Sequence, residues 1–194
     1  MDRYETNIAI LEEAAKFASN SEIIVASGNG FADSLSAAAT GKPILLVKNT
    51  LQEGQKKYLK SLGGGVTFDI VGGTGAVSDG VMKELNAYGS TNRTGGSTRF
   101  ETSVNIAKKF FNKPDVGVLA YGQAFPDGLC GGALAHAMGG PLILTANGKT
   151  DAAVKYAGEA GMKYGAVLGG PTLIDDASVR AIYHMSGSAK IQVK

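Results

Sequence analysis

Two arginines, Arg3 and Arg99, are the residues of this sequence whose type and position suggest binding chemistry. Arg3 and Arg99 each stand at the expected start of a helix, and each is followed by an aromatic residue, a glutamate and a threonine. A positive charge at a helix N-terminus opposes the helix dipole, so each arginine needs a partner. That partner is either a carboxylate within the protein or an external anion, and the residues leave both open.

A loop over residues 27–33 has some features of a phosphate-binding loop. It contains Gly-Asn-Gly, follows an apolar run and precedes a helical pattern. Asp33, however, stands where a dinucleotide-binding motif has its third glycine, and the matching segment 121–127 also lacks the second glycine. Because a carboxylate there would repel a phosphate, we expect Asp33 and Asp127 to cap the helices that follow.

Two glycine pairs, Gly72-Gly73 and Gly169-Gly170, each end an apolar run that is expected to be a strand. The carboxyl ends of strands are where open α/β sheets usually bind ligands. A tight turn explains the same glycines equally well. The residues alone do not decide between these interpretations.

Catalytic and metal-binding patterns are absent from the sequence. It has no Gly-x-Ser-x-Gly motif and no histidine beside a candidate nucleophile. One cysteine, Cys130, and two histidines, His136 and His184, provide neither an intramolecular disulfide nor a zinc site. We therefore predict a protein that is not an enzyme and uses no cofactor or metal. Cys130 lies in an Ala/Gly/Leu-rich segment and is expected to be buried.

Composition narrows the classes of partner and compartment. The 194 residues carry a net charge of +2, with −2 on residues 1–92 and +4 on residues 93–194, so an anionic partner is compatible with the second half. No cluster of Lys and Arg is interleaved with aromatic residues, and no apolar run is long enough for a membrane span, so neither nucleic acid nor membrane is expected. Met1-Asp2 leads directly into a helical pattern. The chain is therefore either cytosolic or a fragment whose targeting segment lies elsewhere.

Internal duplication organises the whole sequence. Five blocks recur in the same order at offsets of 94 to 98 residues, which predicts two modules, 1–92 and 93–194. The recurring pairs are Arg3-Tyr4-Glu5-Thr6 with Arg99-Phe100-Glu101-Thr102, 23–26 with 118–121, 29–33 with 123–127, 41–46 with 139–144, and 70–73 with 167–170.

Apolar strands alternate with helical patterns within each copy. Helices are expected from residue 3 or 99, over 33–40 or 127–138, over 51–62 or 150–160, and from Ser78 or Asp175. Uniformly apolar strands separated by helices favour a parallel sheet that is covered on both faces. We therefore predict an α/β fold of two tandem Rossmann-like modules, each with a three-stranded parallel sheet flanked by helices. The polar segment 92–97 is the expected joint.

The repeated motifs resemble the cell wall binding repeat 2 family of Gram-positive bacteria, over almost the whole chain. The resemblance implies a secreted surface protein whose repeats, commonly three around a pseudo-threefold axis, attach a separate functional domain to an anionic wall polymer. It also implies an anchoring role for the segments Pro43-Ile44-Leu45-Leu46 and Pro141-Leu142-Ile143-Leu144, and polymer contacts for Arg3, Arg93 and Arg99. Two copies and the absence of an Arg-x-Gly joint before Arg3 are expected of a fragment without its signal peptide and third repeat.

The sequence therefore predicts a non-catalytic anchoring module at the cell wall. Its expected partners are an anionic polysaccharide or a teichoic-acid-like polymer, and other copies of the module in the same chain or in a homo-oligomer. Two rival interpretations remain. The chain is a nucleotide- or small-molecule-binding α/β protein if the glycine loop binds a ligand, and a pure oligomerisation module if the apolar segments only pack copies together.

Overall fold

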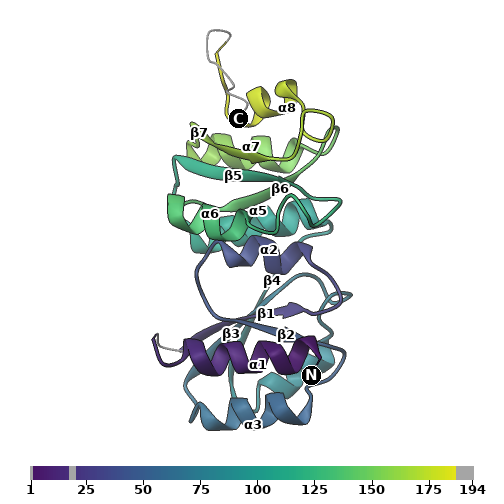
Figure 1. Cartoon of the computed structure of the whole chain (residues 1–194), viewed down its shortest axis with the longest axis vertical. Coiled ribbons are helices and arrows are strands. Elements are labelled where there is room, and N and C mark those ends of the chain that lie inside the picture. Colours follow the sequence, from purple (N-terminus) through teal and green to yellow (C-terminus); the bar gives the residue numbers. More distant parts are fainter. Residues whose placement is uncertain (1, 18–20, 187–194) are drawn as a thin grey trace.

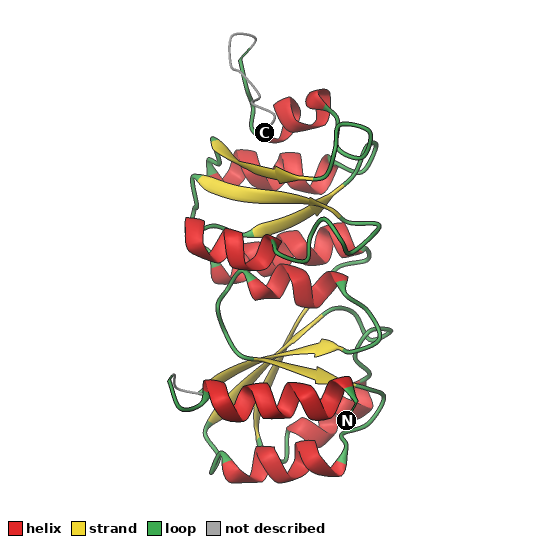
Figure 2. Ribbon diagram, in the orientation of Figure 1, coloured by secondary structure: helices red, strands yellow, loops and turns green. Residues whose placement is uncertain are grey.

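The computed structural model describes residues 2–17 and 21–186 and arranges them in alternating layers of helices and parallel sheets (Figures 1 and 2). The first module contains α1 (Arg3–Ala14), β1 (Glu22–Ser27), α2 (Ala32–Ala38), β2 (Ile44–Val47), α3 (Glu53–Ser61), β3 (Val66–Val71), α4 (Asp79–Leu85) and β4 (Gly89–Thr94). The second contains α5 (Arg99–Phe110), β5 (Val116–Tyr121), α6 (Gly131–Met138), β6 (Leu142–Thr145), α7 (Asp151–Ala160), β7 (Tyr164–Leu168) and α8 (Asp176–Ile182). No helix in these described ranges is long and apolar enough to cross a membrane.

Both sheets are parallel, as predicted. Their strand orders are β2-β1-β3-β4 and β6-β5-β7. In each, the first strand of the module lies in the middle, and the chain crosses first to one side and then to the other. Val25 of β1 pairs with Leu45 of β2 and with Ile70 of β3, and Leu119 of β5 occupies the same place between β6 and β7. The predicted fold class is therefore confirmed.

The first sheet has a fourth strand that the sequence analysis did not predict. Strand β4 pairs with β3 along its whole length, from Val66 with Gly89 to Val71 with Thr94. Its residues are Gly-Ser-Thr-Asn-Arg-Thr, and an edge strand with exposed side chains shows no apolar pattern. The module boundary predicted between residues 92 and 93 falls inside this strand, and the division of the chain at that point stays a prediction.

Helices α1 and α5 run beside the edge strands and satisfy their backbone groups. The side-chain amide of Asn7 donates to the carbonyl of Ile44 at 2.8 Å, and its oxygen accepts from the amide of Leu46 at 2.8 Å. In the second module Ser103 occupies the matching position, and its hydroxyl accepts from the amide of Leu144 at 3.1 Å. Backbone groups at the edges of β2 and β6 are thus paired within the chain, which discourages association through these edges.

The hydrophobic segments after Pro43 and Pro141 form β2 and β6 and lie mostly in the core. Leu45 packs with the outer helices of the first module, whereas Ile44 and Leu46 pack between the two sheets. In β6, Ile143 faces α7 and α8, and its neighbours Leu142 and Leu144 face α2 of the first module. The structure therefore places these segments in the hydrophobic clusters of the fold, and an anchoring role for them stays a prediction.

The two modules share a helical layer. Helix α2 contacts α5, α6 and β6, and Figure 1 shows these three helices between the sheets. One ion pair crosses the junction, from the Lys109 ammonium on α5 to the carboxylate of Asp69 on β3. Asp69 is 1% exposed. Burial by itself would raise the pKa of Asp69, but hydrogen bonds with Lys109, Glu22 and Asn92, together with the charge of Lys109, outweigh this effect and hold the pKa below its usual value.

Replacing Lys109 by methionine should therefore destabilise the chain by about 2–3 kcal/mol, because it leaves a buried carboxylate without its cation. A group whose pKa is lowered by folding contributes stability above its unfolded pKa, near 4, and loses that contribution as the pH falls. The stability difference between the two proteins should be full at pH 7 and shrink below about pH 4. Urea unfolding at several pH values measures it.

The control is Lys108→Met. Lys108 forms a half-exposed ion pair with Glu159, and such pairs contribute at most about 1 kcal/mol. Equal losses in the two variants would show that the junction ion pair has no special role.

Candidate functional site

Arg3 and Arg99 have the same partner in the two modules, and it is neither of the two that the sequence suggested. The Nη1 atom of Arg3 donates to the carbonyl of Gly28 at 2.6 Å, and that of Arg99 donates to the carbonyl of Gly122 at 2.8 Å. Each glycine directly follows the central strand of its sheet. A backbone carbonyl therefore compensates the unfavourable position of each arginine at a helix start.

The aromatic residue beside each arginine packs against the same glycine. A Cβ atom on Gly28 would lie 2.4 Å from the ring of Tyr4, and one on Gly122 would lie 2.7 Å from the ring of Phe100. We call this unit, an arginine on the carbonyl and a ring on the Cα of one glycine, the glycine clamp. It fixes the start of α1 or α5 against the carboxyl end of the sheet.

Arg93 makes a related contact at the end of β4. It donates to the carbonyl of Gly72 at 3.1 Å and to the carboxylate of Asp79 at 3.2 Å, and its side chain is mostly buried. All three candidate arginines thus hold the carbonyl of a glycine that follows a strand. Arg3 and Arg99 are exposed and use one of their five N–H donors in the bonds seen among the described residues. The carbonyl bond holds each guanidinium group in place at the surface, and its other N–H donors remain available there.

A cleft of about 610 Å³ lies at the junction of the modules and includes Arg99. The chain crosses to opposite sides of the first sheet after β1 and β3, and ligands of open α/β sheets bind at such switch points. We call this cleft of about 610 Å³ the junction cleft. Its walls are the segments that follow β1, β3 and β4, together with the start of α5; they comprise Ser27, Asn29, Gly30, Phe31, Ala32, Asp33, Gly73, Gly75, Ala76, Gly96, Ser97, Thr98, Arg99 and Thr102.

Asp33 belongs to this cleft and does not cap α2, so the capping prediction is wrong. Phe31 is the N-cap residue and makes no side-chain capping bond, whereas the Asp33 carboxylate reaches Gly72. Asp127 lies before α6 without capping it, since Cys130 is the N-cap residue there. Burial raises the pKa of Asp33, and the nearby charge of Arg99 opposes that effect.

Phe31 lines the cleft, and Phe125 packs beside it. The Arg99 guanidinium lies 5.4 Å from the ring centre of Phe31, a cation–π contact. The ring of Phe31 in turn lies 5.8 Å from that of Phe125, which is half exposed. These phenylalanines occupy matching positions in the two repeats, and the repeated Phe-x-Asp pattern was the signal that pointed to them. Cation, carboxylate and aromatic ring together suit a sugar that carries an acidic group.

The other predicted site residues lie at different distances from this cleft. Gly73 lines it, and Gly72 forms the turn beneath it, with a φ of +97° that favours glycine. Gly169 and Gly170 make the matching turn after β7. The segments 43–46 and 141–144 are not among its lining residues. Leu45, Leu142, Ile143 and Leu144 are at most 1% exposed, so a contact with a ligand is not available to their side chains.

Cys130 is exposed, contrary to the prediction. At the matching position of the first module, Ser36 is 1% exposed. Ser36 lies inside α2, which contacts α5 and α6 of the second module, whereas Cys130 is the N-cap residue of α6. Among the described residues no group of three His, Cys, Asp or Glu side chains is placed to hold a metal ion.

A family model matches the chain twice. The model describes the cell wall binding domain 2 and matches residues 1–82 and 93–179. Two proteins of Bacillus subtilis (strain 168) are similar in sequence. The amidase enhancer is 31% identical over 146 residues, which is 73% of this chain and 20% of that protein, and the N-acetylmuramoyl-L-alanine amidase LytC is 30% identical over 149 residues, 74% of this chain and 29% of that protein.

Two solved structures share the fold. Cwp8 from Clostridium difficile superimposes with a TM-score of 0.77 at 24% identity, over 94% of this chain and 32% of that one. Cwp6 from the same organism gives 0.75 at 23% identity, over 88% and 28%. This chain therefore spans less than a third of each of these four proteins.

Replacing Gly72 by alanine should destabilise the chain by about 2–3 kcal/mol. The left-handed backbone disfavours a side chain, and the new Cβ would lie 2.4 Å from the Asp33 carboxylate. Gly73→Ala is the matched control, because a Cβ there meets nothing within 4 Å. Thermal or urea unfolding of the two variants measures the difference, and similar stabilities would contradict the close contact between Gly72 and Asp33.

Proposed function

We propose that this chain, which belongs to the cell wall binding domain 2 family, is a non-catalytic module that anchors a larger protein to an anionic polymer of the bacterial wall. The observation that carries the proposal is the junction cleft, where the clamped Arg99 faces Phe31 and Asp33. The natural ligand of such a site is a polysaccharide or a teichoic-acid-like polymer with phosphate or carboxylate groups.

Arg99 has the properties that this ligand requires. Its bond to the Gly122 carbonyl holds the guanidinium in place, so little side-chain entropy is lost when it meets an anion. Guanidinium donors pair with phosphate or carboxylate oxygens in a fork geometry. The Phe31 ring offers an apolar surface to a sugar, and the Asp33 carboxylate accepts hydrogen bonds from sugar hydroxyls. Arg3 and Arg93, which are held in the same way, are proposed as further polymer contacts.

Catalysis is assigned to other parts of the parent protein. The relatives that share this region include an amidase and an amidase enhancer, and the shared region is less than a third of either. We infer that this region supplies attachment to the wall and that a separate domain supplies the activity. A location at the cell surface follows from that role.

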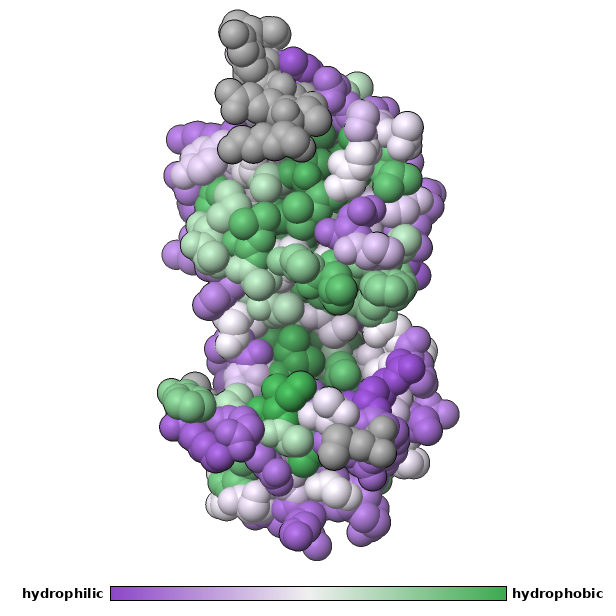
Figure 3. All heavy atoms as spheres, in the orientation of Figure 1, coloured by the Kyte–Doolittle hydropathy of each residue, from purple (hydrophilic) through white to green (hydrophobic). Residues whose placement is uncertain are grey.

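A third module, from the same chain or another copy, is the second part of the proposal. Arg3 occupies the same position in the first module as Arg99 does in the second. Arg99 faces loops of the first module across the junction cleft, so a matching cleft at Arg3 would need the loops of a further copy of the module. Helix α6 is the counterpart of α2, which contacts the second module. We propose that α6 contacts a third module with the corresponding surface. On α6 and the segment before it Phe125, Leu129 and Leu134 are exposed, Leu129 by 62%, and Figure 3 shows hydrophobic residues gathered on the face that carries this helix.

Contacts between matching residues support a rotation axis at this place. Phe31 contacts Phe125, its counterpart. A Cβ on Gly132 would lie 2.5 Å from the Cβ of Ala38, again its counterpart. Equivalent residues of repeated units meet only near the axis that relates the units. A third copy placed around this axis would cover the apolar face of α6.

Wall binding by the purified chain should weaken as salt increases, because ion pairs with the polymer are screened. Arg99→Ala should lower the affinity for isolated walls about tenfold, the usual loss for one charge-assisted hydrogen bond. Arg180→Ala is the control for net charge, since Arg180 lies on α8, away from the cleft. Sedimentation with walls, before and after removal of anionic polymers, measures both effects. Binding that ignores salt and polymer removal would refute the electrostatic mechanism.

The reactivity of the Cys130 thiol can be used to detect docking of a third module on α6. Maleimide should label it rapidly in the dilute chain, where it is exposed, and more slowly when the concentration is raised or a third repeat is attached. The physical reason is that the matching residue of the first module, Ser36, is 1% exposed and belongs to α2, the helix that contacts the second module. Labelling rates together with light scattering test this. An unchanged rate in a three-repeat chain would exclude docking on this face.

A further inference from the structure

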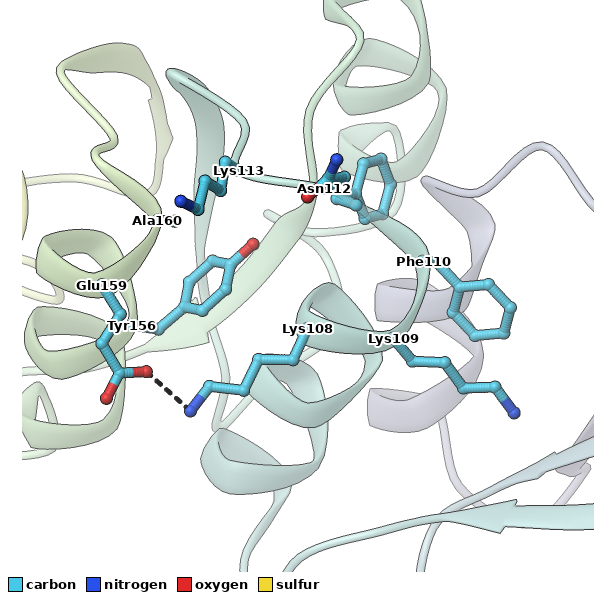
Figure 4. Close-up of a pocket in the computed structure, with 9 residues that line it drawn as sticks. Lys108, Lys109, Phe110, Asn112, Lys113, Tyr156, Glu159 and Ala160 are labelled. Atoms are coloured by element: carbon cyan, nitrogen blue, oxygen red, sulfur yellow. Dashed lines mark ion pairs between the residues drawn. The ribbon is translucent and has the colours of Figure 1, made fainter.

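A second concave site, far from the junction cleft, lies between the C-terminal end of α5 and helix α7 (Figure 4). It has a volume of about 480 Å³, and we call it the α5–α7 pocket. Three lysines reach its walls, Lys108, Lys109 and Lys113, and Phe110 and Phe111 give it an apolar side. Neither the predicted arginines nor the repeated segments take part in it.

Tyr156 provides a hydrogen-bond donor without a partner. The residue is 3% exposed, and its hydroxyl is buried and has no hydrogen-bond partner among the described residues. Figure 4 shows this hydroxyl pointing into the space that Lys113 and Asn112 border. Burial raises the pKa of Tyr156 to about 12, so the group stays protonated and able to donate. Buried polar groups without a partner are rare in folded proteins and call for an explanation.

Tyr58, the matching tyrosine of the first module, differs from Tyr156 in its interactions. Tyr58 is equally buried on α3 but is not left without a partner. The unpaired hydroxyl is thus a property of the second module and not of the repeated scaffold.

The lysines of the pocket differ in what they already bind. Lys108 pairs with Glu159 at 2.8 Å, and Lys109 extends away to Asp69. Lys113 has no ion pair within the described residues, and its φ of +47° places a non-glycine residue in the left-handed region. Backbone strain of this kind gathers at functional sites. An uncommitted ammonium and an uncommitted hydroxyl donor therefore border the same space.

We propose that the α5–α7 pocket binds a sugar that carries a phosphate or carboxylate group. Tyr156 and Lys113 donate to the anionic oxygens, since both are donors and one is charged. The side-chain amide of Asn112 both donates and accepts, which suits a neighbouring sugar hydroxyl. Phe111 contacts the apolar face of the sugar ring. This site does not depend on the proposed polymer contacts in the junction cleft.

Titration of the full chain with glucose 6-phosphate, followed by ¹H–¹⁵N NMR, tests the proposal. Saturable shifts of the amides of residues 110–113 and 156–159 are expected, and glucuronate should shift the same amides. Inorganic phosphate and glucose should each bind at least about tenfold more weakly, because each makes only part of the contacts. Absence of saturable shifts, or inorganic phosphate binding as tightly as glucose 6-phosphate, would overturn the proposal.

Two variants separate binding from folding. Tyr156→Phe removes only the unpaired hydroxyl, and Lys113→Gly removes the charge and relieves the left-handed backbone. Each should weaken glucose 6-phosphate about tenfold and leave the melting temperature unchanged or higher. Tyr58→Phe, the same change in the first module, should bind the sugar as the unaltered chain does. Unchanged affinity in both pocket variants would refute the assignment, whatever the outcome of wall binding.

Discussion

The glycine clamp is the contact on which the arrangement of each module depends. A helix that begins with arginine and an aromatic ring is placed over the glycine that ends the central strand, with the carbonyl bonded by the guanidinium and the Cα covered by the ring. Because no side chain fits at Gly28 or Gly122, the helix start approaches the carboxyl edge of the sheet closely. The same contact that stabilises the fold leaves the arginine at the surface with donors to spare, so scaffold and binding group are one residue.

The glycine clamp also affects the junction between the two modules. Since α5 begins on the clamp at Gly122 and also carries Lys109 to the buried Asp69, it fixes the two sheets relative to each other. The junction cleft is thus made of loops from the first sheet and an arginine from the second module. A single copy of the repeat has all the residue types of this cleft but not the opposing walls, which gives a physical reason for tandem repetition.

Several features were predictable from particular residues. The apolar runs that became β1, β2, β5 and β6 and the helical spacing after Arg3 and Arg99 specify a parallel α/β module, because burial on both faces of a sheet requires uninterrupted apolar strands. Other features were not. Strand β4 is polar, and only the free edge of β3 makes it a strand. Asp33 follows the capping pattern, yet its carboxylate turns towards Gly72 because the cleft places that glycine beside it. Cys130 has apolar neighbours in sequence and lies exposed, because it precedes α6 as its N-cap residue instead of lying within the helix.

By itself, then, the sequence determined the repeat, the fold class and the family, and it singled out Arg3 and Arg99 as candidates, since these follow from residue types at fixed local spacing. Only the tertiary structure decided what the arginines hold, which residues share the junction cleft, and that Tyr156 and Lys113 border a separate pocket. Those relations join residues that are far apart in the chain, such as Arg3 with Gly28 and Phe31 with Arg99. Local patterns carry no information on such distances, because the packing of one layer against the next sets them.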